Sequence, residues 1–140
     1  MVVDTSALIA VLFEERHARW VAARLTEYVG RVKMSTVNLA EALILIRDRQ
    51  PTLYGQLEAH ILSSGIVFVA PDAEQARIAS AARLEYPLNL GDCFAYALAV
   101  TENDAILTLD RDFTRTNVRC LIPKTPAKEM CHDVVKIPGQ

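Results

Sequence analysis

The sequence predicts an α/β protein in which helices cover both faces of a parallel β-sheet, as a three-layer α/β/α sandwich. Short apolar, β-branched segments alternate along the chain with longer segments of helical periodicity. The strand segments are continuously apolar, which is typical of strands that are buried on both faces. A length of 140 residues with 51% hydrophobic and 23% charged residues fits one packed globular domain.

The elements follow one another in a regular order. A strand at "MVVD" (residues 1–4) leads into helices over residues 5–13 and 15–29, and "RVKMS" (31–35) forms the second strand. Ser35 can cap the following helix, residues 36–49, which Pro51 ends. The later elements are a helix over 52–64, a strand over 65–71, helices over 72–86 and 91–103, a strand over 105–110, a turn over 111–116 and a strand over 118–123.

The domain is expected to span residues 1–122, with residues 123–140 as a proline-containing, loosely packed tail. The sequence contains no run of about 18 apolar residues, so no membrane span is predicted. The amino-terminal stretch has no basic segment before its apolar residues and no small-residue cleavage site, so we expect a cytoplasmic protein. The three cysteines, Cys93, Cys120 and Cys131, match no zinc-binding spacing.

Acidic residues cluster where the predicted strands end. Asp4 ends the first strand, Asp110 and Asp112 follow "AILTL", and Glu41 and Asp92 lie on helices that reach toward the same edge. Ligands of open parallel sheets bind at the carboxyl ends of the strands. These five acids are therefore the candidate site residues.

Each acid also has a structural interpretation that the sequence leaves open. Asp4 could cap the helix that follows it, in competition with Thr5 and Ser6. Asp92 could be an acid at the start of a helix, where the helix dipole stabilises it, and the pair after "AILTL" could belong to a solvated turn.

Glu41 is harder to explain by structure alone, because it lies in the apolar helix segment "NLAEALILI". The residues one helical turn away on either side are not cationic: Val37, Asn38, Ile44 and Leu45. Asp92 likewise has no cation one turn away. Carboxylates are rarely buried unless they are paired or bind a metal, and ligands that are all oxygen select hard ions such as Mg²⁺ or Mn²⁺. The acids therefore indicate a site for phosphate chemistry that depends on a divalent ion.

Four segments resemble, in order and spacing, the acidic motifs of the PIN-domain ribonucleases, and most closely those of the VapC toxins of bacterial toxin–antitoxin pairs. These segments are "VVDTSALIAVL", "STVNLAEALILI", "LNLGDCFAYALA" and "ILTLDRDF". The resemblance extends over residues 1–118, and "GDCFAYALA" is its most specific part.

The resemblance implies a role for individual residues. Asp4, Glu41 and Asp92 match the first three metal-binding acids of the family. The fourth is open between Asp110, which ends the strand, and Asp112, which precedes a phenylalanine as in many relatives and is the one we assign to the metal. Three further residues match or accompany these positions: the hydroxyl residues Thr5 and Ser6, and Asn38 as an orienting partner of Glu41.

The resemblance also implies a PIN-like fold, an Mg²⁺- or Mn²⁺-dependent endoribonuclease toxin, a homodimer and a VapB-type antitoxin that inserts a peptide into the active-site groove. A metal-activated water would attack the RNA phosphodiester. Because the net charge of −2 gives no general attraction for RNA, local arginines are candidate phosphate contacts: Arg47, Arg111 and Arg115.

Several alternatives remain at this point. A phosphatase of the haloacid dehalogenase type needs a second aspartate two residues after the first, and Ser6 stands there. A PIN nuclease that acts in RNA maturation or on DNA, and a catalytically silent PIN-like binding module, are both compatible with the motifs.

Overall fold

The computed structural model describes residues 1–124, so most of the expected tail lies outside the described part. Five parallel strands form one sheet in the order β3-β2-β1-β4-β5. The strands are β1 (Val2–Val3), β2 (Lys33–Ser35), β3 (Val67–Val69), β4 (Ile106–Leu107) and β5 (Cys120–Leu121). The helices of the described residues are α1 (Thr5–Leu12), α2 (Ala18–Glu27), α3 (Thr36–Arg49), α4 (Tyr54–Leu62), α5 (Ala73–Glu85) and α6 (Leu90–Glu102), with the short 3₁₀-helices η1 (Pro51–Leu53) and η2 (Arg111–Arg115).

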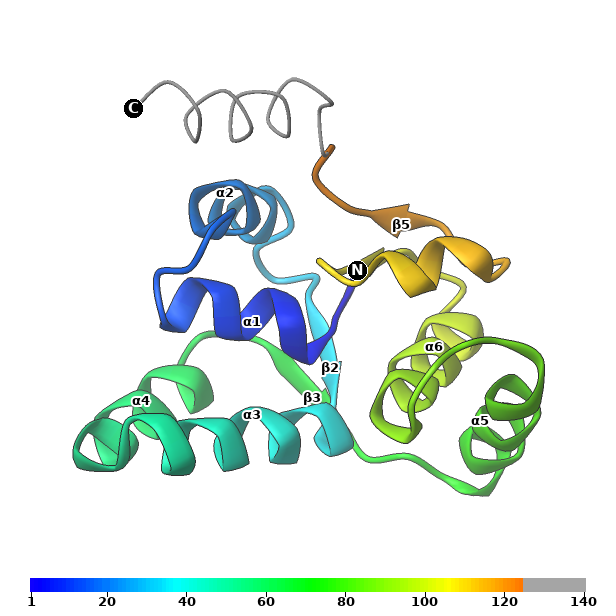
Figure 1. The fold of residues 1–140 in the computed structure, drawn as a ribbon, viewed down its shortest axis with the longest axis horizontal. Helices are drawn as coiled ribbons and strands as arrows, with labels where there is room; N and C mark the ends of the chain where they lie inside the picture. Colours follow the sequence, from blue (N-terminus) through cyan, green and yellow to red (C-terminus); the bar gives the residue numbers. More distant parts are fainter. Residues whose placement is uncertain (125–140) are drawn as a thin grey trace, which may run out of the picture.

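The predicted three-layer α/β/α sandwich is confirmed. Helices α1 to α4 lie on one side of the sheet, and α5 and α6 lie on the other (Figure 1). Neighbouring strand residues point to opposite faces, so Val3 and Leu107 belong to the core under α1 to α4. Val2 and Ile106 belong to the core under α5 and α6. Burial on both faces is the reason why these strands are apolar without interruption.

Side chains that cap the helices explain where most of them begin. Asp4 caps α1, Ser35 caps α3 as predicted, and Asp72 caps α5, each by accepting a hydrogen bond from a first-turn N–H. Helix α6 begins at Leu90, and its cap is Asn89, whose side-chain oxygen accepts from the N–H of Asp92. Asp92 is therefore an acid inside the first turn of α6.

The boundaries of some elements differ from the sequence-based expectations. Helix α2 begins at Ala18 because Glu14 and His17 adopt left-handed backbone conformations, with φ of 51° and 73°. The expected helix over 52–64 is divided into η1, which has Pro51 in its first turn, and α4. None of the helices in residues 1–124 combines the length and hydrophobicity needed to cross a bilayer.

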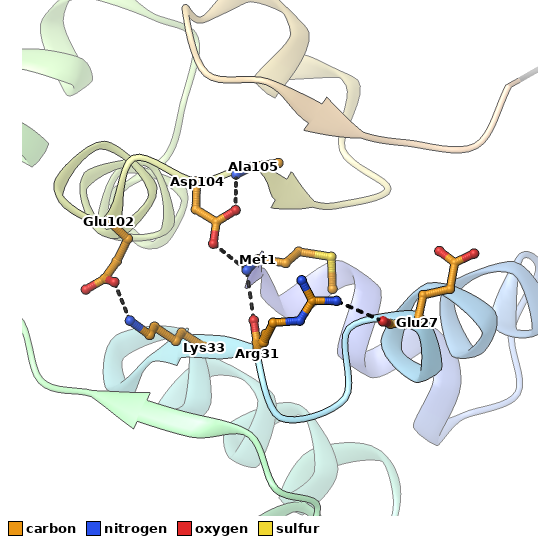
Figure 2. Close-up of polar contacts among 7 residues, drawn as sticks. All are labelled: Met1, Glu27, Arg31, Lys33, Glu102, Asp104 and Ala105. Atoms are coloured by element: carbon orange, nitrogen blue, oxygen red, sulfur yellow. Dashed lines mark hydrogen bonds and ion pairs between the residues drawn. The ribbon is translucent and has the colours of Figure 1, made fainter.

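Paired charges stabilise the amino end of the sheet, opposite the carboxyl end at which the site acids are predicted. The α-amino group of Met1 donates to the backbone oxygen of Arg31 at 2.9 Å and forms an ion pair with Asp104 (Figure 2). Lys33 forms a second ion pair with Glu102. Burial alone would raise the pKa of Asp104, but hydrogen bonds from the Met1 amino group and from a backbone N–H outweigh burial and lower that pKa.

We expect Asp104→Asn to lower the free energy of unfolding at neutral pH, because the buried amino group of Met1 loses its ionic acceptor. The loss should be only about 1–2 kcal/mol, because Asp104 is itself partly exposed to solvent. A carboxylate with a lowered pKa stabilises the fold fully above its ordinary value of 3.8, and this stabilisation disappears as the pH falls through the lower folded value. Urea unfolding of both proteins between pH 2 and 7 checks this dependence.

Glu102→Gln is the matched control for this prediction. Glu102 forms its pair with Lys33 at the same end of the sheet, but both side chains are about one-third exposed. A pair of that kind contributes less than about 1 kcal/mol. Equal losses of stability in the two variants would contradict the assignment of Asp104 as the more important partner.

Candidate active site

The candidate active site lies at the carboxyl end of the sheet, where β1 and β4 are neighbours. The chain continues from β1 toward β2 and β3 on one side and places β4 and β5 on the other, so this is the point where the strand order reverses. A pocket opens here between the first turns of α1 and α6 and one side of α3. It is lined by Asp4, Thr5, Ser6, Glu41, Ile44, Leu45, Asn89, Asp92 and Asp110.

Asp4 is the most deeply buried acid of the pocket, with a side chain that is 2% exposed. One of its oxygens, Oδ1, accepts hydrogen bonds from Ser6 Oγ at 2.8 Å and from the N–H of Ala7 at 3.2 Å. The other, Oδ2, accepts from Thr108 Oγ1 at 2.8 Å. Burial nevertheless outweighs these hydrogen bonds and raises the pKa of Asp4 to about 6.

Ser6 and Thr108 join Asp4 to the end of β4. Ser6 Oγ accepts a hydrogen bond from the N–H of Leu109 at 3.0 Å, and Thr108 Oγ1 accepts one from the N–H of Asp110 at 2.9 Å. The two hydroxyls therefore fix Asp4 relative to the segment that carries Asp110. Sequence reasoning missed Thr108, and the available signal was a hydroxyl in the otherwise apolar segment "AILTL".

Glu41 projects from α3 and is held by donors from two helices. Its Oε1 accepts from Thr5 Oγ1 at 2.7 Å and from Asn38 Nδ2 at 3.0 Å. Asn38 Nδ2 also donates to the backbone oxygen of Gly91 at 3.0 Å. The Glu41 carboxylate thus links α1 to α3, and Asn38 links both to the first turn of α6.

Asp92 lies in the first turn of α6, and its carboxyl group is partly buried. Burial is the largest cause that raises its pKa to about 7, followed by the negative charges of Asp110, Asp4 and Glu41. A backbone hydrogen bond at Asn89 lowers the pKa by less than these effects raise it. Asp92 therefore experiences repulsion from the other acids of the pocket and has no cationic partner among the residues that line it.

The structure distinguishes between the two acids of "TLDRDF". Asp110 lines the pocket, caps η2 and contributes to the raised pKa values of both Asp4 and Asp92. Asp112 does not line the pocket, and its N–H donates to Asp110 Oδ1 at 2.9 Å. The acids that come together are thus Asp4, Glu41, Asp92 and Asp110.

The three candidate arginines do not line the pocket. Arg47 lies over the ring of Tyr54, with its guanidinium carbon 3.7 Å from the ring centroid. Arg111 and Arg115 are exposed on η2, directly after Asp110. Among the described residues the pocket is lined by acidic, hydroxyl, amide and apolar side chains only.

The chemistry of the pocket fits a hard divalent cation, because its possible ligands are carboxylate, hydroxyl and amide oxygens. As placed, however, no three His, Cys, Asp or Glu side chains of residues 1–124 are close enough to hold one ion. Donors from the protein already hold Asp4 and Glu41, and repulsion among the acids favours wider spacing. For three of these carboxylates to share one ion, their side chains would therefore have to move closer together.

Comparison with known proteins identifies the family of the chain. The family model of the PIN domain matches residues 1–118. Ribonuclease VapC42 of Mycobacterium tuberculosis is 34% identical over 128 residues, which cover 85% of this chain and 97% of that protein.

Solved structures of low sequence identity share the fold. The crystal structure of VapC20 of Mycobacterium tuberculosis, described as a toxin that cleaves the sarcin–ricin loop, is 18% identical with a TM-score of 0.74, and the match covers 87% of this chain and 98% of that one. A toxin–antitoxin complex from Klebsiella pneumoniae is 21% identical with a TM-score of 0.71 and covers 89% of this chain and 98% of that one. The chain belongs to the PIN-domain family, and within it to the VapC ribonucleases.

Proposed function

We propose that this protein is an Mg²⁺- or Mn²⁺-dependent endoribonuclease and the toxin of a VapBC-type toxin–antitoxin pair. The observation that carries the proposal is the convergence of Asp4, Glu41, Asp92 and Asp110, from four separate segments, on one pocket with no cationic lining residue among those described. The relatives named VapC ribonucleases support the same activity. The presence of all four acids argues against a catalytically silent module.

In this proposal the four acids hold the divalent cation, and the neighbouring donors keep the acids in place. When bound, the cation would supply a Lewis acid that activates water and stabilises the charge developing on the phosphate. Ser6 and Thr108 orient Asp4, whereas Thr5 and Asn38 orient Glu41. All four donors contribute hydrogen bonds to ionised carboxylates, which are stronger than bonds between neutral groups.

RNA is the proposed substrate, and the residues that contact its phosphates are proposed to lie beside the pocket. Arg111 and Arg115 are exposed on η2, which follows Asp110 directly in the chain. This position suits them to contact the phosphates of an RNA strand that passes over the pocket. Arg47, which stacks on Tyr54, is the weakest of the three candidates because its guanidinium is already engaged.

We also infer a VapB-type antitoxin as partner, and a homodimer. The structural neighbour from Klebsiella pneumoniae is a toxin–antitoxin complex. On this chain, Leu84 of α5 is 91% exposed and Leu90 of α6 is 64% exposed. These two leucines are the candidate contacts with another chain that the proposal names.

The function is tested with single-stranded RNA and purified protein. We expect cleavage in Mg²⁺ or Mn²⁺, none in excess EDTA, and a rate at least about 100-fold lower for Asp92→Asn, which removes a charged ligand. Asp92→Asn should fold as well as the wild type or better, because the repulsion that raises the pKa of Asp92 is relieved. Cleavage by the wild type that persists in EDTA would refute the metal-dependent mechanism.

Metal affinity should increase with pH. The pKa values of about 6 for Asp4 and about 7 for Asp92 mean that protons compete with the ion at low pH and not at high pH. Calorimetry with Mn²⁺ in two buffers of different ionisation enthalpy should show that more protons are released per ion at pH 6.5 than at pH 8. An affinity that does not change between these pH values would show that neither carboxyl group binds the ion.

The fourth acid is tested with two matched variants. Asp110→Asn should lower Mn²⁺ affinity and the cleavage rate by about 10-fold or more, because it removes a charge from the pocket but keeps the oxygen that caps η2. Asp112→Asn should change either quantity by less than about 3-fold. The opposite ranking in calorimetry and cleavage assays would identify Asp112 as the ligand.

A further inference from the structure

The carboxylate of Glu41 occupies the space in which any residue other than glycine at position 91 would place its Cβ. A Cβ built on Gly91 would lie 2.0 Å from Glu41 Oε2, 2.4 Å from Cδ and 2.6 Å from Oε1. These separations are far below van der Waals contact, so a side chain at position 91 and the observed Glu41 carboxylate exclude each other.

Space, and not backbone conformation, accounts for the glycine at position 91. Gly91 lies in the first turn of α6 and has none of the positive φ found at Gly30 and Gly65. A helical backbone accepts alanine more readily than glycine. Gly55, in the first turn of α4, has no atom within 4 Å of a constructed Cβ and shows that a helical glycine in this protein need not be crowded.

Asn38 holds the same carboxylate from the other side. Its side chain is 1% exposed, and Nδ2 donates both to Glu41 Oε1 and to the backbone oxygen of Gly91. A flipped amide would place Oδ1 against these two acceptors, so only one orientation is compatible with its surroundings. Within the described residues Oδ1 has no hydrogen-bond partner, which indicates that the two bonds of Nδ2 determine the position of Asn38.

We propose that Gly91 and Asn38 are positioning residues that set the location of the Glu41 carboxylate relative to Asp92. Gly91 provides the space, and Asn38 ties Glu41 to the backbone of the turn that carries Asp92. Because Oε1 accepts from Thr5 and Asn38, Oε2, the atom closest to a Cβ built on Gly91, is the oxygen left for a ligand role once the side chains move. The role of Oε2 depends on the proposed function, whereas the contact between Glu41 and Gly91 does not.

The contact is tested without metal, by a double-mutant cycle on thermal unfolding in EDTA. Gly91→Ala should lower the unfolding temperature by about 3–6 °C, because Glu41 must leave its donors. In a Glu41→Ala background the same substitution should leave it unchanged or raise it, since the clash is absent and alanine favours the helix. An equal loss in both backgrounds would overturn the proposed contact.

The consequence for metal binding is tested by calorimetry with Mn²⁺ at pH 8. Gly91→Ala should bind Mn²⁺ about 10- to 100-fold more weakly than the wild type, and the control Gly55→Ala should bind within about 2-fold of it. Unchanged affinity in Gly91→Ala would overturn the positioning role. Failure of the wild type itself to bind Mn²⁺ would instead overturn the proposed function. The contact between Glu41 and Gly91 would then still be tested by the double-mutant cycle on thermal unfolding.

If Gly91→Ala does not fold, Asn38→Ala tests the positioning of Glu41 instead. It removes the donor without adding atoms, so Glu41 loses one hydrogen bond and its link to Gly91. We expect weaker Mn²⁺ binding by about 10-fold, with a circular dichroism spectrum like that of the wild type. Wild-type affinity in this variant would contradict the role assigned to Asn38.

Discussion

Repulsion among carboxylates that the fold brings together is the constraint on which the rest of this structure depends. Asp4, Glu41, Asp92 and Asp110 meet in one pocket, where burial and like charge raise the pKa values of Asp4 and Asp92. The surrounding hydroxyl and amide donors offset only part of this effect. In the proposed function, a divalent cation bound by these acids would remove the remaining repulsion.

The same side chains serve the fold and the site. Asp4 caps α1 and Asp110 caps η2, and each remains in the pocket while it does so. A carboxylate has two oxygens, so one can accept from a helix N–H while the other faces different partners. From the sequence alone, a capping role and a ligand role compete as explanations of Asp4. In the structure Asp4 does cap α1, and this role is compatible with its proposed role as a ligand.

The two ends of the sheet carry opposite kinds of electrostatics. At the amino end, Met1 pairs with Asp104 and Lys33 pairs with Glu102, so each acid there has a cation (Figure 2). At the carboxyl end, the pocket acids have only neutral donors among the described residues. Ion pairs thus stabilise the fold at the amino end of the strands. Negative charge without a paired cation is concentrated at the carboxyl end, where the strand order reverses.

The sequence by itself determined the fold class, the alternation of elements and the selection of Glu41 as a candidate site residue. Periodicity and the absence of a cation one helical turn away are local properties that a sequence shows directly. Only the tertiary structure decided that Asp110 and not Asp112 lines the pocket, that Thr108 supports Asp4, and that Gly91 makes room for Glu41. These relations join segments that are tens of residues apart. Their distances follow from how helices and strands pack, which no local pattern encodes.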